Sequence, residues 1–199
     1  MLIRDHVSFM NFKTEGLILD VGCGPNINSK NLNLDYTWRP GIDICCDITR
    51  GLPLKNDYVG GIFSEHCIEH ITFDAAYFVM GEFLRVMKPG AYFRLIVPDL
   101  EIYVDCFANS RGTGENSAPY ADGDARHGIN SGAMSINRIM RAHGHLFIYD
   151  FSTLARMMER LGFVEIKKVC FGQGVDQSLI FDSWHRSAES LYIEARKSL

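Results

Sequence analysis

Short apolar runs that end in glycine or an acid recur along the first third of the chain. Residues 17–21, 31–35, 42–48 and 58–64 have the sequences LILDV, NLNLD, IDICCDI and YVGGIFS. Runs of this length, bounded by turn-forming residues, are typical of strands buried in a parallel sheet. A stronger run, AYFRLIVPDL over 91–100, predicts a fifth strand.

Apolar residues at helical spacing separate the fourth and fifth predicted strands. Asp74 is the predicted N-cap of this helix, and Lys88-Pro89-Gly90 is its predicted end. A second helix is predicted between Ser152 and Gly162. The first helix presents one buried stripe, formed by Ala76, Val79, Met80, Phe83, Leu84 and Met87.

Two further runs, residues 163–171 and 189–197, predict closing strands. Strands that alternate with turns or helices predict an α/β doubly wound sheet, here in a single domain over residues 1–199. Residues 106–146 interrupt this pattern and are rich in Gly, Ser, Asn and Asp. We expect them to form a lid or acceptor-binding insert, with a short helix around 133–141; a mobile surface loop is the alternative.

Composition narrows the range of partners. The chain has 199 residues, 47% of them apolar, and a net charge of −4, which argues against a nucleic-acid footprint. The N-terminus does not resemble a signal peptide and no apolar run is long enough to span a bilayer, so we expect no membrane partner. The six cysteines form no C-x-x-C pair, which fits a reducing cytoplasm.

The sequence LDVGCGPN places Gly22 and Gly24 directly after the first predicted strand. Glycine permits a positive φ and lets a ligand approach the main chain closely. Asp35 ends the next strand, where a carboxylate can accept hydrogen bonds from a ribose diol. Asp47 ends the third strand, where it can accept a bond from an adenine amino group. A turn-forming role for Asp35 and a capping role for Asp47 are the simpler alternatives.

Several motifs in this order resemble those of the class I S-adenosylmethionine-dependent methyltransferases. The closest likeness is to small predicted methyltransferases associated with bacterial sugar and surface-polysaccharide pathways. The resemblance covers most of the chain and is weakest over residues 101–142. The motifs that carry it are LDVGCGP, LNLD, CDITRGLPL, FSEHCIEHI, LRVMKPGAYFRLIVPD, GHLFIYDFSTLARMMERLGF and AESLYIEARK.

This resemblance implies a Rossmann-like, seven-stranded mixed sheet with the order 3-2-1-4-5-7-6 and an antiparallel last strand. It implies S-adenosyl-L-methionine as the cofactor. Carried over by position, the methionine part would face Asp20 and the main chain of Gly22, Cys23 and Gly24. Asp35 would hold the ribose, Asp47 and the amide of Ile48 would address the adenine, and Ser64 and Glu65 would close the pocket.

The chain departs from the family pattern in its early connections. Pro25 and Asn26 replace the usual third glycine, and only ten residues separate Gly24 from Asp35. The spacing leaves no room for full-length early helices and fits a nicotinamide cofactor poorly. Shortened helices would leave one sheet face under-covered, so we expect residues 2–12 or a partner subunit to cover it, which makes a homodimer a candidate assembly.

The segment HCIEH, residues 66–70, also matches the H-x-x-E-H signature of the inverted zinc peptidases. In that alternative His66 and His70 would bind zinc from one helix, Glu69 would be the base, and Glu159 is an available third ligand. The segment instead follows a predicted strand directly, so we expect no metal.

For methyl transfer to oxygen, the candidates for a catalytic base are His66, Asp99 and His145. The predicted function is methyl transfer to a small polar acceptor, with a hydroxyl, on a sugar among others, as the expected group. A protein that binds the cofactor without turnover is the alternative.

Overall fold

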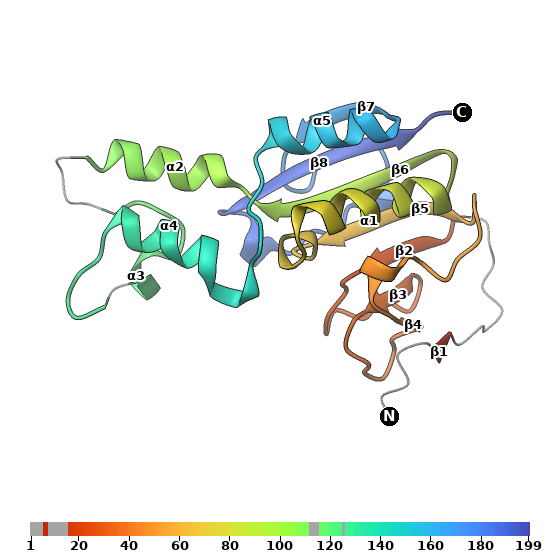
Figure 1. Cartoon of the computed structure of the whole chain (residues 1–199), viewed down its shortest axis with the longest axis horizontal. Coiled ribbons are helices and arrows are strands. Elements are labelled where there is room, and N and C mark those ends of the chain that lie inside the picture. The colour runs from red at the N-terminus through yellow and green to blue at the C-terminus, as the bar shows by residue number, and fades with distance from the viewer. Residues whose placement is uncertain (1–5, 8–15, 112–115, 125) are drawn as a thin grey trace.

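The computed structural model describes residues 6–7, 16–111, 116–124 and 126–199 of the chain. A mixed β-sheet lies at its centre, with two long helices packed on one face (Figure 1). The strands are β1 (His6–Val7), β2 (Ile18–Val21), β3 (Leu32–Asp35), β4 (Ile44–Cys45), β5 (Val59–Glu65), β6 (Met87–Pro98), β7 (Phe163–Val169) and β8 (Ser190–Lys197).

Seven of these strands have the spatial order β4-β3-β2-β5-β6-β8-β7. The first five of this series are parallel to one another, whereas β8 is antiparallel to both of its neighbours. Counted from β2, the order is 3-2-1-4-5-7-6 with an antiparallel seventh strand, which confirms the predicted Rossmann-like sheet. The two residues of β1 add an eighth, antiparallel strand beside β4.

The connections before the first long helix are short, as predicted. Two 3-10 helices, η1 (Ile48–Arg50) and η2 (Ile68–His70), precede α1 (Phe73–Val86), and the described part of the chain has no α-helix before α1. The prediction of Asp74 as the N-cap was wrong. Thr72 is the cap, because its Oγ1 accepts a hydrogen bond from the Ala75 N–H at 3.3 Å.

The main core lies between the sheet and the two helices α1 and α5 (Phe151–Leu161). Alternate strand residues, among them Leu19, Ile62 and Leu95, are fully buried on this face. α5 ends at Gly162, whose φ of 102° is left-handed, as the sequence predicted. The helices contribute Val79, Met80, Phe83, Leu154 and Met158 to this core.

The opposite face of the sheet is covered by the connection between β7 and β8. Leu179, in the 3-10 helix η4 (Gln177–Leu179), packs with Phe181 against Phe63 and Ile96 of the sheet. A segment of the chain's own C-terminal third therefore lies where a covering segment was expected. Of the expected cover, residues 2–12, all but His6–Val7 fall outside the described residues, and that pair lies at the sheet edge.

A fully buried arginine holds this covering connection in place. Arg94 of β6 forms ion pairs with Asp182, at 2.6 Å, and with Glu194 of β8, at 2.9 Å. Its Nη1 also donates to the carbonyl of Gln173 at 2.9 Å. Burial of this charge is tolerable because two carboxylates and main-chain oxygens surround it.

Helices α2 (Leu100–Asn109), α3 (Ala121–Asp124) and α4 (Gly132–Arg141) form a group that projects beyond one end of the sheet (Figure 1). α4 matches the short helix predicted around 133–141, whereas the strand predicted to extend to residue 100 ends at Pro98. Asp99 caps α2 by accepting a bond from the Glu101 N–H at 3.0 Å. The small core of this helical group contains Tyr103, Ala118, Ile139 and Ile148.

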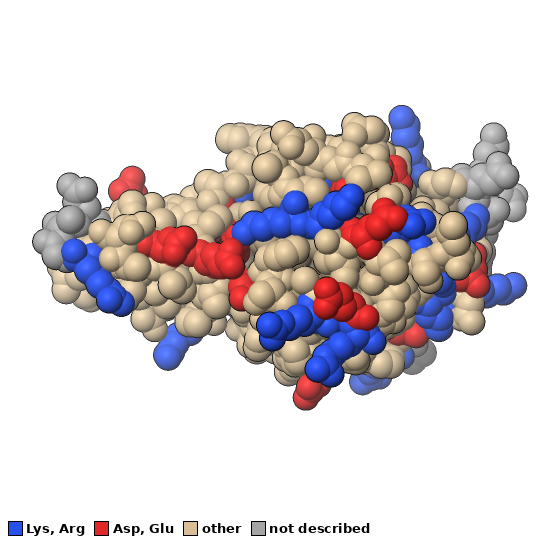
Figure 2. All heavy atoms as spheres, turned by 90° about the horizontal axis from the view of Figure 1, so that it is seen from above, with Lys and Arg blue, Asp and Glu red and all other residues tan. Residues whose placement is uncertain are grey.

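On the face shown in Figure 2, lysines and arginines lie among acidic residues, and a short run of basic side chains crosses the middle of the face between two acidic groups. Across the described residues, every helix is too short or too polar to cross a bilayer.

Candidate functional site

β2 ends in a turn built on two left-handed glycines. Gly22 has a φ of 72° and Gly24 a φ of 57°. The N–H groups of Gly22 and Cys23 both donate to the carbonyl of Leu34, at 2.8 and 3.2 Å. A Cβ at position 22 would lie 2.6 Å from Cys67 Sγ, so the turn packs closely against the residues that follow β5. Both the backbone conformation and the contact require glycine here.

Asp35, at the end of β3, stabilises this turn. Its Oδ2 accepts a hydrogen bond from the Gly24 N–H at 2.9 Å, and its Oδ1 accepts one from the Thr37 N–H at 2.7 Å. Each carboxylate oxygen retains a lone pair for a further donor. The turn-forming role considered for Asp35 is therefore present, and it leaves the carboxylate able to bind a diol.

A cavity of about 400 Å³ opens at the carboxyl ends of the central strands. This volume lies within the range of small-molecule sites, and its position is the one where open α/β sheets bind ligands. Of the predicted cofactor residues, it brings together Gly22, Asp35, Asp47 and Ile48, with the catalytic candidate His66. The remaining lining residues are Val21, Leu34, Tyr36, Cys46, Cys67 and His70.

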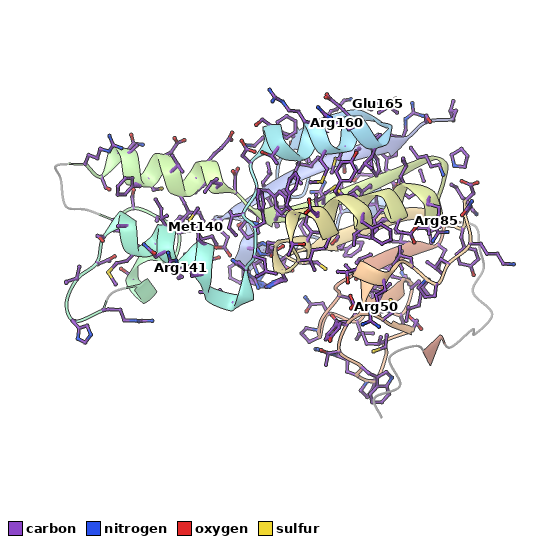
Figure 3. All side chains as sticks on the ribbon, in the orientation of Figure 1. Arg50, Arg85, Met140, Arg141, Arg160 and Glu165 are labelled. Atoms are coloured by element: carbon purple, nitrogen blue, oxygen red, sulfur yellow. The ribbon has the colours of Figure 1, made fainter. Side chains whose placement is uncertain are left out.

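Asp47 both caps η1 and lines this cavity. Its Oδ1 accepts bonds from the N–H and the hydroxyl of Thr49, at 3.1 and 2.6 Å. Its Oδ2 lies 3.6 Å from Arg50 Nε, on the largely exposed side chain labelled in Figure 3. The capping role considered from the sequence is therefore present and uses Oδ1, whereas Oδ2 faces the Arg50 guanidinium.

A second, smaller cavity of about 120 Å³ shares Gly22 with the first. It contains Asp20 and Glu65, which project from β2 and β5. Burial, the neighbouring Glu65 and Asp35 together raise the pKa of Asp20 to about 7. Glu65 accepts bonds from the N–H and hydroxyl of Ser183, at 3.0 and 2.5 Å. The site thus brings two carboxyl groups close together, and a cationic group would stabilise their charged forms.

Burial also raises the pKa of the Cys23 thiol, to about 12. Cys23 lines the smaller cavity as a neutral thiol. This fits a packing role beside the main-chain turn better than a nucleophilic one.

Two predicted residues have other contacts. Ser64 is fully buried and donates to the carbonyl of Val21 at 3.3 Å, so it ties β5 to β2. Asp99 is buried beneath Lys168, with 3.2 Å between Oδ2 and Nζ, and caps α2. Burial raises the pKa of Asp99, and Lys168 opposes the shift. Neither residue belongs to the described lining of the two cavities.

His66 follows β5 with a φ of 49°, and its side chain lines the larger cavity. Its Nε2 lies 2.8 Å from Ser190 Oγ, whose hydroxyl donates to the carbonyl of Arg186 at 2.8 Å. Because that hydroxyl hydrogen is used, the network assigns the imidazole hydrogen to Nε2. Nδ1 is then the acceptor, 3.4 Å from both Glu69 Oε1 and Arg186 Nη1.

His145 follows η3 (Ala142–Gly144), and the segment after it contacts the turn that follows His66. The N–H groups of Leu146 and Phe147 both donate to the carbonyl of Glu69, at 2.7 and 3.2 Å. The rings of His145 and His70 then lie 4.9 Å apart, edge to face. Figure 3 labels Met140 and Arg141 at the end of α4 that leads into this contact.

The HCIEH segment does not have the geometry of the zinc-peptidase motif. β5 continues to Glu65, His66 has a positive φ, and η2 spans only Ile68–His70. That motif needs both histidines one turn apart on the same helix.

Sequence reasoning missed several residues of the site. Phe181 and Ser183, which line the smaller cavity, come from the connection between β7 and β8 and carry no local motif. Cys67 and His70 lie within a quoted motif, but their packing against the glycine turn and the cavity depends on the fold.

No protein-family model and no curated protein matches the sequence, whereas several solved structures match the fold. A methyltransferase dependent on S-adenosylmethionine from Archaeoglobus fulgidus superposes with a TM-score of 0.58 at 14% identity, over 94% of this chain and 88% of the other. A Thermotoga maritima protein, named as a possible histamine N-methyltransferase, gives 0.57 at 14% identity, over 92% and 83%.

The chain has the fold of the S-adenosylmethionine-dependent methyltransferases. A third structure of this fold is the 1,6-didemethyltoxoflavin-N1-methyltransferase of Burkholderia thailandensis, solved with bound 1,6-didemethyltoxoflavin and S-adenosylhomocysteine. It superposes with a TM-score of 0.52 at 14% identity, over 92% of this chain and 71% of the other. At these identities the likeness establishes the fold, and the function is argued from the site.

Proposed function

We propose that this chain transfers a methyl group from S-adenosyl-L-methionine to a hydroxyl of a small polar acceptor. The observation that carries the proposal is the cavity of about 400 Å³ where the glycine turn, Asp35, Asp47 and Ile48 meet. The fold shared with S-adenosylmethionine-dependent methyltransferases supports it.

Each part of the cofactor has a chemically suited partner in the two cavities. The free lone pairs of Asp35 suit the ribose diol, and Asp47 with the Ile48 amide suits the adenine edge. The methionine part carries an ammonium group, which suits the carboxyl groups of Asp20 and Glu65 in the smaller cavity because a cation there favours their charged forms. Gly22 and Gly24 let the cofactor approach the main chain between the two cavities.

The reaction is an in-line displacement. An acceptor oxygen attacks the methyl carbon, the new C–O bond forms as the C–S bond breaks, and the sulfonium sulfur keeps the electron pair. The hydroxyl proton must leave, and His66 Nδ1 is the suited base because Ser190 holds the other ring nitrogen. Alignment of the two reacting groups supplies the rest of the acceleration.

Residues 106–146 supply the acceptor side in this proposal. They include α3 and α4, and they return to the site at His145, beside the cavity residue His70. The resemblance to methyltransferases of sugar pathways makes a sugar hydroxyl the first acceptor class to test. A cytoplasmic location and a homodimeric assembly stay predictions from the sequence.

Calorimetry with S-adenosylhomocysteine tests the cofactor site, and we expect one molecule to bind per chain. A screen of sugars and small hydroxylated metabolites, read as release of S-adenosylhomocysteine, tests turnover. His66→Gln should lower kcat for any acceptor found while leaving the affinity for S-adenosylhomocysteine within about threefold, since the loss of a general base affects the chemical step. Tight binding without turnover on a broad panel would favour the alternative of a non-catalytic binder, and failure to bind would end the proposal.

A further inference from the structure

Glu69 is a buried carboxylate whose oxygens make no hydrogen bond within the described part of the chain. The residue is fully buried in η2, and both Oε1 and Oε2 lack a hydrogen-bond partner. Burial of a carboxylate is costly unless a charge or hydrogen bonds compensate it. A carboxylate in this environment favours a cationic partner, and the histidines beside it serve as such a partner only when they are protonated.

Three imidazoles surround this carboxylate: His66 Nδ1 lies 3.4 Å from Glu69 Oε1 but has its ring hydrogen on Nε2, and the rings of His70 and His145 lie on the side of the cavity and α4. His70 Nε2 lies 3.7 Å from Glu69 Oε1, and the ring of His145 packs against His70. One ligand atom from each of Glu69, His70 and His145 lies within 4.8 Å of the others. These are the donor types of a metal centre with two histidines and one carboxylate.

The protonation of His145 is set by its main-chain contact. Nδ1 lies 2.6 Å from the carbonyl of Ile139, which can only accept, so Nδ1 carries the hydrogen. The lone pair is left on Nε2. A carbonyl bonded to the second ring nitrogen is the usual arrangement around a metal-binding histidine, because it fixes both the tautomer and the ring orientation.

Main-chain hydrogen bonds hold the neighbours Glu69 and His70 beside His145, which comes from a segment far away in the chain. The Glu69 carbonyl accepts bonds from the two N–H groups that follow His145. The main chains of η2 and of the segment after η3 (Ala142–Gly144) are therefore joined directly behind the three side chains. Such pre-organisation favours binding, because little side-chain freedom is lost.

We propose that Glu69, His70 and His145 bind one first-row divalent cation, with Zn²⁺ or Mn²⁺ as the representative ions. Imidazole ligands disfavour Ca²⁺ and Mg²⁺, which take oxygen donors. Ligand atoms at about 2.1 Å from one ion lie at most about 4.2 Å apart, so the side chains close by a small rotation on binding. This proposal reverses the expectation from the sequence that the chain holds no metal, and it differs from the peptidase motif because Glu69 is a ligand.

The cation would take part in methyl transfer, a role that rests on the proposed function. The His70 side chain is 39% exposed and also lines the larger cavity, so open coordination positions face the space where the acceptor must lie. An acceptor hydroxyl bound there would lose its proton more readily, and His66 Nδ1, 3.4 Å from Glu69 Oε1, is placed to receive it. The cation orients the oxygen, and the methyl group still comes from the sulfonium.

Metal binding can be measured without any acceptor. Chelator-treated protein is titrated with Zn²⁺, Mn²⁺ and, as a spectroscopic probe, Co²⁺, using calorimetry and visible absorption. We expect one ion per chain. Glu69→Gln, which keeps the side-chain shape, and His145→Ala should each weaken binding by at least about a hundredfold, because loss of a residue that only orients a ligand already costs about 10–100-fold.

His185→Ala is the matched control, because His185 is an exposed histidine on η5 (Trp184–Arg186), outside the three-residue cluster. It should bind the ion as the unchanged protein does. Circular dichroism of each variant confirms that it is folded. The proposal is overturned if the folded protein binds no ion, or if Glu69→Gln and His145→Ala bind it with unchanged affinity.

Binding of S-adenosylhomocysteine to the same samples separates this inference from the proposed function. Binding of the nucleoside without any ion would overturn the metal site alone. Binding of an ion that Glu69→Gln abolishes, without binding of the nucleoside, would support the metal site and overturn the proposed methyl transfer. For any acceptor found, turnover should fall at least about tenfold after chelation and return with Zn²⁺ or Mn²⁺; unchanged turnover would overturn the catalytic role.

Discussion

The carboxylate of Asp35 accepts a hydrogen bond from the main-chain N–H of Gly24 at 2.9 Å, although the two residues follow different strands of the sheet. The bond joins the glycine turn after β2 to the end of β3. It fixes the conformation of the turn before any ligand arrives, and it leaves lone pairs of the carboxylate for the ligand. One side chain thus organises the site and takes part in it.

Asp35→Ala should therefore weaken binding of S-adenosylhomocysteine by about 10–100-fold, because hydrogen bonds to a charged group contribute about 1.5–3 kcal/mol. Calorimetry measures the change. Asp35→Asn should be milder, since the amide keeps one acceptor oxygen. Asp74→Asn, at an exposed position in the first turn of α1, is the matched control and should bind normally. Equal affinities for all four proteins would remove Asp35 from the cofactor site.

Gly22→Ala should destabilise the fold and abolish cofactor binding, because the new Cβ would contact Cys67 Sγ at 2.6 Å. Gly16→Ala separates this contact from backbone strain: Gly16 has the same φ of 72°, and a Cβ added there would meet nothing within 4 Å. Strain of this kind costs about 1–3 kcal/mol. In thermal unfolding, Gly22→Ala should lower Tm further than Gly16→Ala does. Similar Tm values would show that close packing at residue 22 is unimportant.

Arg94→Met should lower the free energy of unfolding by about 3–5 kcal/mol, because it leaves Asp182 and Glu194 as buried, uncompensated carboxylates. Urea denaturation measures the loss. The loosened connection between β7 and β8 should also become more sensitive to proteolysis. Arg160→Met, at the exposed α5 residue labelled in Figure 3, is the control and should change stability by less than about 0.5 kcal/mol.

The stability of the folded protein should depend on pH through the carboxyl group of Asp20. Its pKa is raised in the folded state from 3.8 to about 7, so the folded protein holds this proton more tightly than the unfolded chain does. The stability that this proton contributes is complete below about pH 4 and is lost as pH rises through about 7.

Asp20→Asn removes this titration. The variant should gain stability relative to the unchanged protein as pH rises from about 4 to about 8, as measured by urea denaturation at each pH. Asp74→Asn, whose carboxyl is exposed, provides the reference curve. The two proteins could instead differ in free energy of unfolding by the same amount at every pH in this range. That result would show that Asp20 is not protonated more readily in the folded state.

Local patterns in the sequence predicted most of the fold. Apolar runs indicated the parallel strands, helical spacing indicated α1 and α5, and the glycine stop at Gly162 is present. The early connections were predicted to be short because ten residues cannot hold a turn, a covering helix and a strand. The errors were local. Thr72, two residues before the predicted cap, starts α1. α1 ends at Val86, so Met87 and the predicted helix end Lys88-Pro89-Gly90 already belong to β6. Asp99 starts a helix where a strand was expected to continue.

What the sequence determined by itself is therefore the strands and the residues that end them, because apolar runs and turn-forming residues are signals between neighbours in the chain, whereas the strand order was implied by the family resemblance. Only the tertiary structure decided which of those residues share a site. In the folded chain Ser64 and Asp99 make structural contacts, and Leu179 and Phe181 pack on the sheet face opposite α1 and α5. The tertiary structure also brought His145 to Glu69 through hydrogen bonds between main chains. Contacts of this kind join segments far apart in the chain. Main-chain hydrogen bonds do not depend on which side chains are present, so a sequence pattern cannot predict them.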